Sequence, residues 1–292
     1  MKRRRDGTYL GDVPAFRRIV PYLLRTRTGS MVFFPQRIEV DGLLAWLHDA
    51  NEGRPRDERV TLFDVFLAAI ARTMRLRPET NRFVSGRRTY QHRDIAISFV
   101  VKEAMSDQAA ESEVRLVLSG EETVEDVRRL VTAAVTRERR GEQGDDDRLV
   151  AFFASWPRPL LELISWLIRV LDYQNVLPAA LRKAIPLYTS AYVVNTGSLG
   201  IDPPFHHLYD YGTASVFVAI GRVTREPVVD EDGGIVARSG VNVVYTLDER
   251  ATDGYYFART AEVIRRLVAE PDLLDRPDLT VDDIVPVWPP RS

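Results

Sequence analysis

Asp248-Glu249-Arg250-Ala251-Thr252-Asp253-Gly254 is the most informative stretch of the sequence. It follows a strand-like run at residues 240–247 and precedes a helix-like run at residues 255–269, so it reads as a loop between two regular elements. Loops held by rigid elements often carry catalytic side chains. Three of its seven residues are acidic and one is arginine, so it is a charged loop whose carboxylates need partners or solvent.

The composition is that of an ordinary globular protein. Of 292 residues, 45% are hydrophobic and 28% are charged, and the formal net charge is -2. This balance predicts no basic face for nucleic acid, so we expect no nucleic-acid partner. The absence of cysteine excludes disulfides, thiolate nucleophiles and cysteine metal sites. The basic start, Met1-Lys2-Arg3-Arg4-Arg5, leads into polar residues and is not a secretory signal, so we expect a cytoplasmic protein.

Hydrophobic periodicity predicts helices and strands in one domain that spans residues 1–292. The clearest helix is residues 61–76, where Thr61 and Asp64 have capping-box spacing. Other helices are predicted at residues 41–51, 123–140, 159–173 and 255–269. Strands are predicted at residues 31–34, 88–90, 95–101, 113–118, 190–195, 215–223 and 240–247. These elements do not alternate as regular βαβ units, so we predict an α/β fold of the α+β type, a two-layer sandwich with a mixed sheet covered by helices.

The longest apolar stretch, residues 159–173, predicts an amphipathic helix. Its polar members are three or four positions apart and share one face: Glu162, Ser165, Arg169 and Asp172. A spanning helix needs about 20 apolar residues, so this helix is too short to cross a membrane. Helices that lie on a membrane surface usually have a polar face rich in lysine and arginine. We therefore expect burial in a core or a subunit interface and no membrane contact.

The loop at residues 248–254 resembles a family signature. It is similar to the D-H-R-x-x-D-G motif of dihydrolipoyl acyltransferase (2-oxoacid dehydrogenase acyltransferase) catalytic domains, in the chloramphenicol-acetyltransferase-like superfamily, with Glu249 at the position of the catalytic histidine. Further matches follow the family's order over roughly residues 17–270. They are Ile38-Glu39-Val40-Asp41, Leu62 to Ala69, Pro78 with Asn81, Ile95-Ala96-Ile97, Asn195-Thr196-Gly197-Ser198-Leu199-Gly200 for an S-N-L-G loop, and Val218-Ala219-Ile220-Gly221-Arg222 for an I-L-G-I-G-R strand.

This resemblance implies the chloramphenicol-acetyltransferase-like fold, a homotrimer with active sites between subunits, and coenzyme A (CoA) or acyl-CoA as a substrate. The resemblance starts almost at the N-terminus. We therefore expect neither a lipoyl domain nor a peripheral subunit-binding domain, and no bound lipoate. We also do not expect the usual acyl-shuttling role inside a 2-oxoacid dehydrogenase complex.

Glu249 is the main departure from the family pattern. In the family, the histidine removes a proton from a thiol, and the thiol attacks a thioester carbonyl. An imidazole with a reference pKa of about 6.5 suits this task, whereas glutamate, at about 4.3, is a weak base for a thiol at about 8.5. Two hypotheses stay open. Glu249 is either the working base, for a different nucleophile, or a structural carboxylate in an inactive site.

The resemblance also implies roles for Asp253 and for a loop hydroxyl. Asp253 matches the family aspartate that orients the catalytic loop through an ion pair or hydrogen bond. The S-N-L-G loop of the family supplies a hydroxyl that stabilises the tetrahedral oxyanion. An ungapped match from Val218 places Thr196 there, whereas alignment on Leu199-Gly200 selects Ser198; we favour Thr196. Either hydroxyl can instead serve only to hold the turn.

His206 and His207 follow that loop closely. They are candidates for a displaced catalytic base, for a metal pair with Asp202 or Asp210, or for ordinary packing and surface roles. Adjacent side chains of an extended segment point in opposite directions, so we expect no shared metal.

We therefore predict a CoA-dependent acyltransferase that moves an acyl group between CoA and a small acceptor or a separate carrier, with Glu249 or a nearby histidine as the base. The alternative is a catalytically silent family member that acts as an assembly or regulatory scaffold. A third hypothesis is acyl chemistry at a membrane surface, with the helix at residues 159–173 as the contact.

Overall fold

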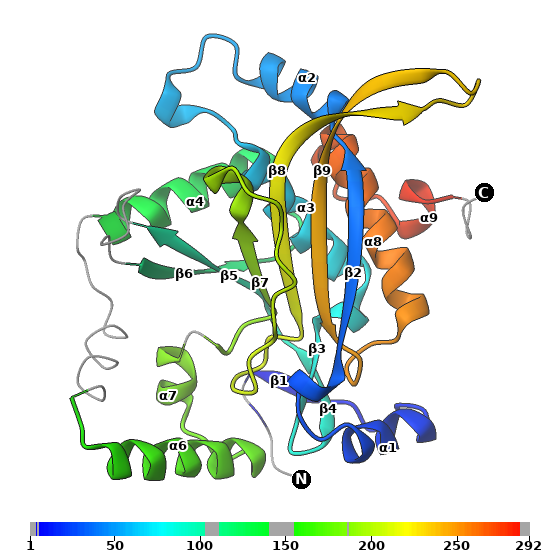
Figure 1. The fold of residues 1–292 in the computed structure, drawn as a ribbon. Coiled ribbons are helices and arrows are strands. Elements are labelled where there is room, and N and C mark those ends of the chain that lie inside the picture. The colour runs from blue at the N-terminus through cyan, green and yellow to red at the C-terminus, as the bar shows by residue number, and fades with distance from the viewer. Residues whose placement is uncertain (1–3, 5, 103–110, 140–154, 186, 287–292) are drawn as a thin grey trace.

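The computed structural model describes residues 4, 6–102, 111–139, 155–185 and 187–286. Its centre is a six-stranded mixed sheet with the strand order β2-β9-β8-β7-β5-β6 (Figure 1). The strands are β2 (Met31–Glu39), β5 (Ile95–Lys102), β6 (Glu111–Leu118), β7 (Ala191–Asn195), β8 (Val216–Val229) and β9 (Ile235–Asp248). Strand β7 is parallel to both β5 and β8, and the other neighbours are antiparallel.

Helices cover one face of this sheet. They are α2 (Asp41–Ala50), α3 (Leu62–Leu76), α4 (Val124–Arg139), α8 (Gly254–Ala269) and the short α9 (Val281–Ile284). Helix α3 begins with the predicted capping box, because the Thr61 side chain accepts from the Asp64 N–H while the Asp64 side chain accepts from the Thr61 N–H. Its fully buried Phe66 belongs to the same core as Tyr245 of β9 and Leu267 of α8. The predicted two-layer, mixed-sheet architecture is confirmed.

Residues 200–214 cover part of the other face of the sheet as an extended segment without helix or strand. A second, smaller core forms there, in which Leu208 and Ala214 of the segment pack with Tyr192, Phe217 and Val244 of the sheet. This face therefore carries the segment that contains both predicted histidines.

A three-stranded antiparallel sheet, order β1-β4-β3, lies at the lower end of the molecule in Figure 1, together with three helices. The elements are β1 (Gly7–Tyr9), β3 (Arg82–Ser85), β4 (Arg88–His92), α1 (Ala15–Leu23), α6 (Arg158–Tyr173) and α7 (Ala179–Ala184). The buried Arg4 guanidinium donates to Ser85 Oγ at 2.6 Å and to Asn175 Oδ1 at 3.0 Å, and it lies 3.1 Å from the Asp172 carboxylate. Arg4 thereby fastens the end of α6 to the small sheet.

Short 3₁₀ turns connect the larger elements, at Thr28–Ser30 (η1), Arg56–Glu58 (η2), Pro78–Asn81 (η3), Thr196–Leu199 (η4) and Pro271–Asp275 (η5). The predicted helices are found close to their expected bounds, whereas β8 extends six residues beyond its predicted end and β9 begins five residues before its predicted start. Helix α1 was not predicted, because Pro21 lies inside it and proline normally disrupts a helix interior.

Helix α6 corrects one expectation. None of its residues is buried, and the side chains of Leu163 and Trp166 are 56% and 59% exposed. Burial of this helix in the core of its own chain was therefore a wrong prediction, whereas burial between subunits is not tested by a single chain. Within the described ranges, no helix has the length and apolar character needed to cross a membrane.

Candidate active site

The loop at residues 248–254 is built on the carboxylate of Asp248, which is fully buried. Arg250 binds it through Nε at 2.8 Å and Nη2 at 2.7 Å, and Ser30 Oγ donates to it at 3.0 Å. Arg27, also buried, brings its Nε to 3.5 Å from the same carboxylate. Burial of a charged group is tolerated only with such partners. The end of β9 is therefore fixed to the 3₁₀ turn η1 and to the residue that follows Glu249.

The main chain of Glu249 is fixed by hydrogen bonds, whereas its side chain has no partner among the described residues. Its N–H donates to the Ser30 carbonyl at 2.9 Å, and its carbonyl accepts from Arg17 Nη1 at 2.9 Å. The side chain is exposed, and its carboxylate has no hydrogen bond or ion pair with any residue that the structure describes. The arrangement thus presents a carboxylate to the surface on a rigidly held backbone.

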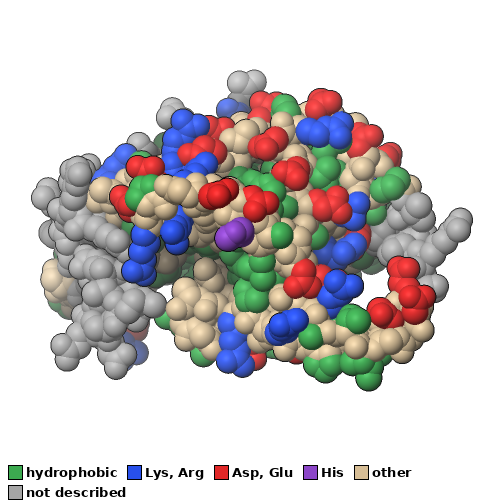
Figure 2. Space-filling model, turned by 90° about the horizontal axis from the view of Figure 1, so that it is seen from above, with side chains coloured by type: hydrophobic (Ala, Val, Ile, Leu, Met, Phe, Trp, Pro, Cys, Tyr) green, Lys and Arg blue, Asp and Glu red, His purple; other side chains and the backbone are tan. Residues whose placement is uncertain are grey.

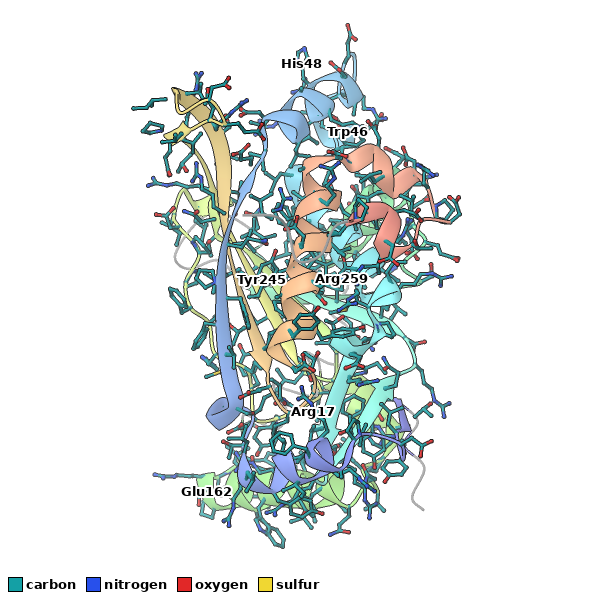
Figure 3. All side chains as sticks on the ribbon, turned by 90° about the vertical axis from the view of Figure 1, so that its right-hand side faces the viewer. Arg17, Trp46, His48, Glu162, Tyr245 and Arg259 are labelled. Carbon is teal, nitrogen blue, oxygen red and sulfur yellow. The ribbon has the colours of Figure 1, made fainter. Side chains whose placement is uncertain are left out.

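Asp253 connects the loop to two helices. Its carboxylate forms an ion pair with Arg17 of α1 at 2.9 Å, and it caps α8 by accepting from the Tyr256 N–H at 2.7 Å. Partial burial raises the pKa of Asp253, but the hydrogen bonds from Tyr256 and Arg17 outweigh it, so the pKa is lowered and the group stays charged. Arg17, labelled in Figure 3, lies between α1 and the start of α8. It therefore links Asp253 directly to the Glu249 backbone, beside a cavity of about 130 Å³.

Gly254 begins α8 without a close approach of another backbone segment. A Cβ placed there would meet only the Phe34 ring, at 3.9 Å, which is an ordinary contact.

Thr196 and Ser198 lie together in η4, directly after β7. Thr196 is buried, and its hydroxyl donates to the Ile220 carbonyl at 3.0 Å. Ser198 is exposed, and its hydroxyl donates to the Asn195 carbonyl at 2.7 Å. Both hydroxyls therefore bond to the main chain here, in agreement with the turn-holding alternative, while Ser198 is the one that reaches solvent.

This turn packs tightly on β8. A Cβ at Gly197 would lie 2.3 Å from the Gly221 carbonyl oxygen, so only glycine fits there. The pairing of β8 with β9 shifts register between Ile220 and Val223, which marks a bulge. Bulges are frequent next to active sites, where they redirect side chains.

Glu249 and Thr196 are not brought together within one chain. Glu249 follows the end of β9, where Leu247 pairs with Val216 at the start of β8. Thr196 follows Asn195, which pairs with Ile220 further along β8. Four to five residues of strand correspond to roughly 15 Å. A single chain therefore contains the two halves of the predicted site at opposite ends of one strand segment.

His206 and His207 lie over the sheet on the extended segment. The His206 ring stacks on Phe217 with centroids 3.9 Å apart, and the His206 carbonyl accepts from Thr246 Oγ1 at 2.7 Å. Burial lowers the pKa of His206, so it is neutral near pH 7. The rings of the two histidines stack on each other rather than pointing oppositely, but their Nδ1-to-carbonyl bond and ring contacts are ordinary packing. Across the described ranges, no group of three or more His, Cys, Asp or Glu could hold a metal ion.

Arg17, Arg27 and Ser30 were missed as members of the site. A buried aspartate such as Asp248 requires a cation nearby. The sequence contains 40 lysines and arginines, so that requirement alone does not select Arg27. The partners became visible only when α1 and η1 were placed beside the loop.

Residues 189–275 match the family model described as 2-oxoacid dehydrogenases acyltransferase (catalytic domain). No curated protein matches the chain. Among solved structures, a probable dihydrolipoamide acetyltransferase from Listeria monocytogenes superposes with a TM-score of 0.59 at 14% identity, covering 94% of this chain and 98% of that one. The dihydrolipoamide acetyltransferase (E2p) of Azotobacter vinelandii gives 0.60 at 12% identity, covering 91% and 93%.

A chloramphenicol acetyltransferase is also similar, with a TM-score of 0.50 at 11% identity, covering 90% of this chain and 98% of that one. Identities this low establish the fold alone. The partial family match adds the C-terminal half of the sheet, η4 and the loop at residues 248–254. The chain therefore has the chloramphenicol-acetyltransferase-like fold, and its resemblance to the acyltransferase catalytic domain of 2-oxoacid dehydrogenases is confirmed.

Proposed function

We propose that this protein transfers an acyl group between CoA and a small acceptor or separate carrier, with Glu249 as the general base. The observation that supports this most is the geometry of the loop at residues 248–254. Hydrogen bonds from Arg17 and to Ser30 fix the Glu249 main chain, yet its carboxylate is exposed and unengaged. A structural carboxylate would be expected to bind a neighbour, as Asp248 does.

The chemistry needs no further reactant. The Glu249 carboxylate accepts the proton of the acceptor X–H while X attacks the thioester carbonyl carbon of acyl-CoA. A hydroxyl of η4 stabilises the resulting oxyanion. The carbon–sulfur bond then breaks, and the departing CoA sulfur takes back the proton from Glu249. The products are acyl-X and free CoA.

The separation of Glu249 from η4 supports an assembly in which two subunits complete each site. Rotation about a closed symmetry axis can bring the Glu249 end of one subunit to the η4 end of the next. We therefore propose a homotrimer, as the family resemblance implies. Exposure favours Ser198 over Thr196 as the hydroxyl that turns to the oxyanion, since Thr196 must first release the Ile220 carbonyl.

The test is CoA release from acetyl-CoA in the presence of dihydrolipoamide or a simple alcohol or amine. With an alcohol or amine acceptor a thiol-reactive dye reports the released CoA, because the chain has no cysteine. With dihydrolipoamide one thiol is consumed for each CoA released, so CoA and acetyl-CoA are separated by chromatography instead. We expect Glu249→Gln to lower the rate by about 10²- to 10⁴-fold, the usual contribution of a general base. Glu249→His should retain or raise the rate towards thiols, because imidazole has the better-matched pKa.

Three controls make the result specific. Glu231 lies in the exposed turn between β8 and β9, so Glu231→Gln should leave the rate unchanged. His206→Gln and His207→Gln test the displaced-base alternative, which would be supported if either one, but not Glu249→Gln, abolished transfer. No transfer by the wild type, together with no thermal shift in the presence of CoA, would favour the silent scaffold.

A further inference from the structure

The lower end of the molecule presents two helices with their apolar sides outward. Helices α1 and α6 lie at this same end in both Figure 1 and Figure 3, where Glu162 marks α6. On α1, the side chains of Phe16 and Leu23 are 70% and 67% exposed. The outward apolar residues are Phe16, Ile19, Tyr22 and Leu23 of α1, and Leu160, Leu163, Trp166, Leu167, Val170 and Tyr173 of α6. We call this set the apolar end face.

Helix α6 is apolar on two sides. Leu161, Ile164, Ile168 and Leu171 are half-buried towards the protein, whereas the exposed side carries Leu163, Trp166 and Leu167. Asp172 at the end of the helix pairs with Arg4, and Tyr211 donates to the Ser165 carbonyl. The second apolar side therefore remains uncovered within the chain, and an exposed apolar patch of this kind marks a contact with an apolar partner.

A cavity of about 300 Å³ opens beside the end of α6. It is bounded by residues 25–27, which follow α1, by the β3–β4 turn and by residues 210–212. Five arginines and two aspartates line it: Arg25, Arg27, Arg87, Arg169, Arg250, Asp172 and Asp210. We call it the arginine cavity.

The positive charge of this cavity is in excess. Asp172 is already paired with Arg4, and Asp210 accepts from the N–H groups of Arg27 and Thr28. The side chains of three lining arginines have no ion pair with any described residue: Arg25, Arg87 and Arg169. Clustered guanidinium groups of this kind match the oxygens of a phosphate.

We propose that the arginine cavity binds the phosphate of an anionic phospholipid headgroup and that the apolar end face enters the lipid around it. A phosphate-binding cluster beside an exposed apolar surface matches the boundary of an anionic membrane, where headgroup phosphates lie next to acyl chains. The sequence argued against membrane contact because the polar face of α6 is not basic. The structure supplies positive charge from Arg25, Arg87 and Arg169, which line one cavity and form no ion pair with any described residue.

The opposite end of the molecule differs. Seen from above in Figure 2, lysine and arginine side chains alternate with aspartate and glutamate over that end. A surface of mixed charge has little net attraction for an anionic membrane. Binding should therefore orient the molecule with α1 and α6 towards the lipid.

The first test is co-sedimentation of the full chain with vesicles. We expect binding to vesicles of phosphatidylcholine and phosphatidylglycerol in equal parts, and weak binding to phosphatidylcholine alone. Arg25→Gln and Arg169→Gln should each weaken binding about fivefold, the usual effect of one cation near an anionic surface. Leu163→Glu should weaken vesicle binding at least about tenfold, because a charge replaces an apolar side chain that would otherwise enter the lipid.

Matched controls lie at the β8–β9 hairpin. Val229→Glu replaces a residue that is 73% exposed, and Arg238→Gln removes an exposed arginine that forms no ion pair with any described residue. Both should bind vesicles like the wild type. Trp166 provides a second readout, since its fluorescence should shift to shorter wavelength on vesicles and the shift should be absent in Trp166→Phe.

Three outcomes would overturn the proposal. The first is a wild type that fails to bind the anionic vesicles. The second is a Leu163→Glu variant that changes the size of the assembly in light scattering while vesicle binding is unchanged, which would make α6 a subunit contact. The third is thermal stabilisation by soluble glycerol phosphate without any vesicle binding, which would assign the cavity to a free phosphate. None of these readouts requires acyl transfer, so the proposed function can fail separately.

Discussion

Two buried guanidinium groups, those of Arg27 and Arg250, share the single carboxylate of Asp248. Asp248→Asn keeps the shape but removes the charge, so both arginines lose their compensation in a buried setting. Breaking such a cluster typically costs about 3–5 kcal/mol. We expect the free energy of unfolding in urea to fall by that amount. A loss below about 1 kcal/mol would show that solvent or another carboxylate compensates the arginines.

The Arg17–Asp253 pair should behave differently, because its side chains are 23% and 49% exposed. Pairs this exposed contribute about 1 kcal/mol or less, and asparagine can still cap α8. Asp253→Asn should therefore change stability little. Under the proposed function it should lower kcat/KM for acyl transfer by at least about tenfold, because Arg17 also holds the Glu249 carbonyl.

Asp282→Asn is the matched control for this prediction. Asp282 is exposed and forms an ion pair with Arg259 of α8, away from the Arg17–Asp253 pair. It should leave both stability and transfer nearly unchanged. Equal rates for wild type and Asp253→Asn would remove Asp253 from the positioning role.

The sequence predicted those helices and strands whose formation depends on residues close to one another in the chain. The α3 capping box and the helix at residues 255–269 follow from local residue patterns, and both are found. Helix α1 was not predicted because it contains Pro21. The placement of α6 depends on its contacts with Arg4 and Tyr211, more than 40 residues away in the sequence. Likewise Arg17 and Arg27 reach the loop at residue 248 only through tertiary contacts.

Strand β4 makes stability depend on pH through His92. Its ring packs on Phe83 with centroids 4.3 Å apart, and burial lowers its pKa to about 4. In the unfolded chain, a histidine titrates near 6.5. Between these values the unfolded chain takes up a proton that the folded chain does not bind, so stability falls as the pH drops from about 6.5 to about 4. The free energy of unfolding falls by at most about 3 kcal/mol over this range, because the ring is partly accessible to solvent.

Urea unfolding at pH 7, 5.5 and 4.5 would measure this loss. His92→Gln should flatten the dependence on pH in that window. His48→Gln, on the exposed surface of α2, should keep the slope of the wild type. An unchanged slope in His92→Gln would assign the acid sensitivity to other groups.

At the scale of the whole molecule, the sequence could predict the fold because its weak matches follow one order along the chain. It could not place the two halves of the site in space. Glu249 and η4 are about fifty residues apart in sequence and at opposite ends of one β8 segment in the structure. Only the assembly can bring them together, so the mechanism depends on the subunit arrangement.

This dependence leads to a prediction about mixed assemblies. Under the proposed function, Glu249→Gln and the double variant Thr196→Val/Ser198→Ala should each be nearly inactive. In a mixed trimer, an intact Glu249 from one variant can meet an intact η4 from the other across a subunit boundary. Random mixing of equal amounts pairs them correctly in about a quarter of the sites, because each of two neighbours must be of the right kind.

Co-expression of the two variants with different tags, followed by purification through both tags, yields the mixed assemblies. Light scattering should give the mass of three 33.2 kDa chains or a multiple of it. Purification through both tags removes the unmixed trimers, and each mixed trimer contains one correct boundary out of three. The rate should therefore recover towards about a third of the wild-type value, whereas the parents mixed after folding and without subunit exchange should stay inactive. Mixed trimers as inactive as the parents would show that each site lies within one chain, which would require Glu249 and η4 to approach each other by a movement along β8 of roughly 15 Å.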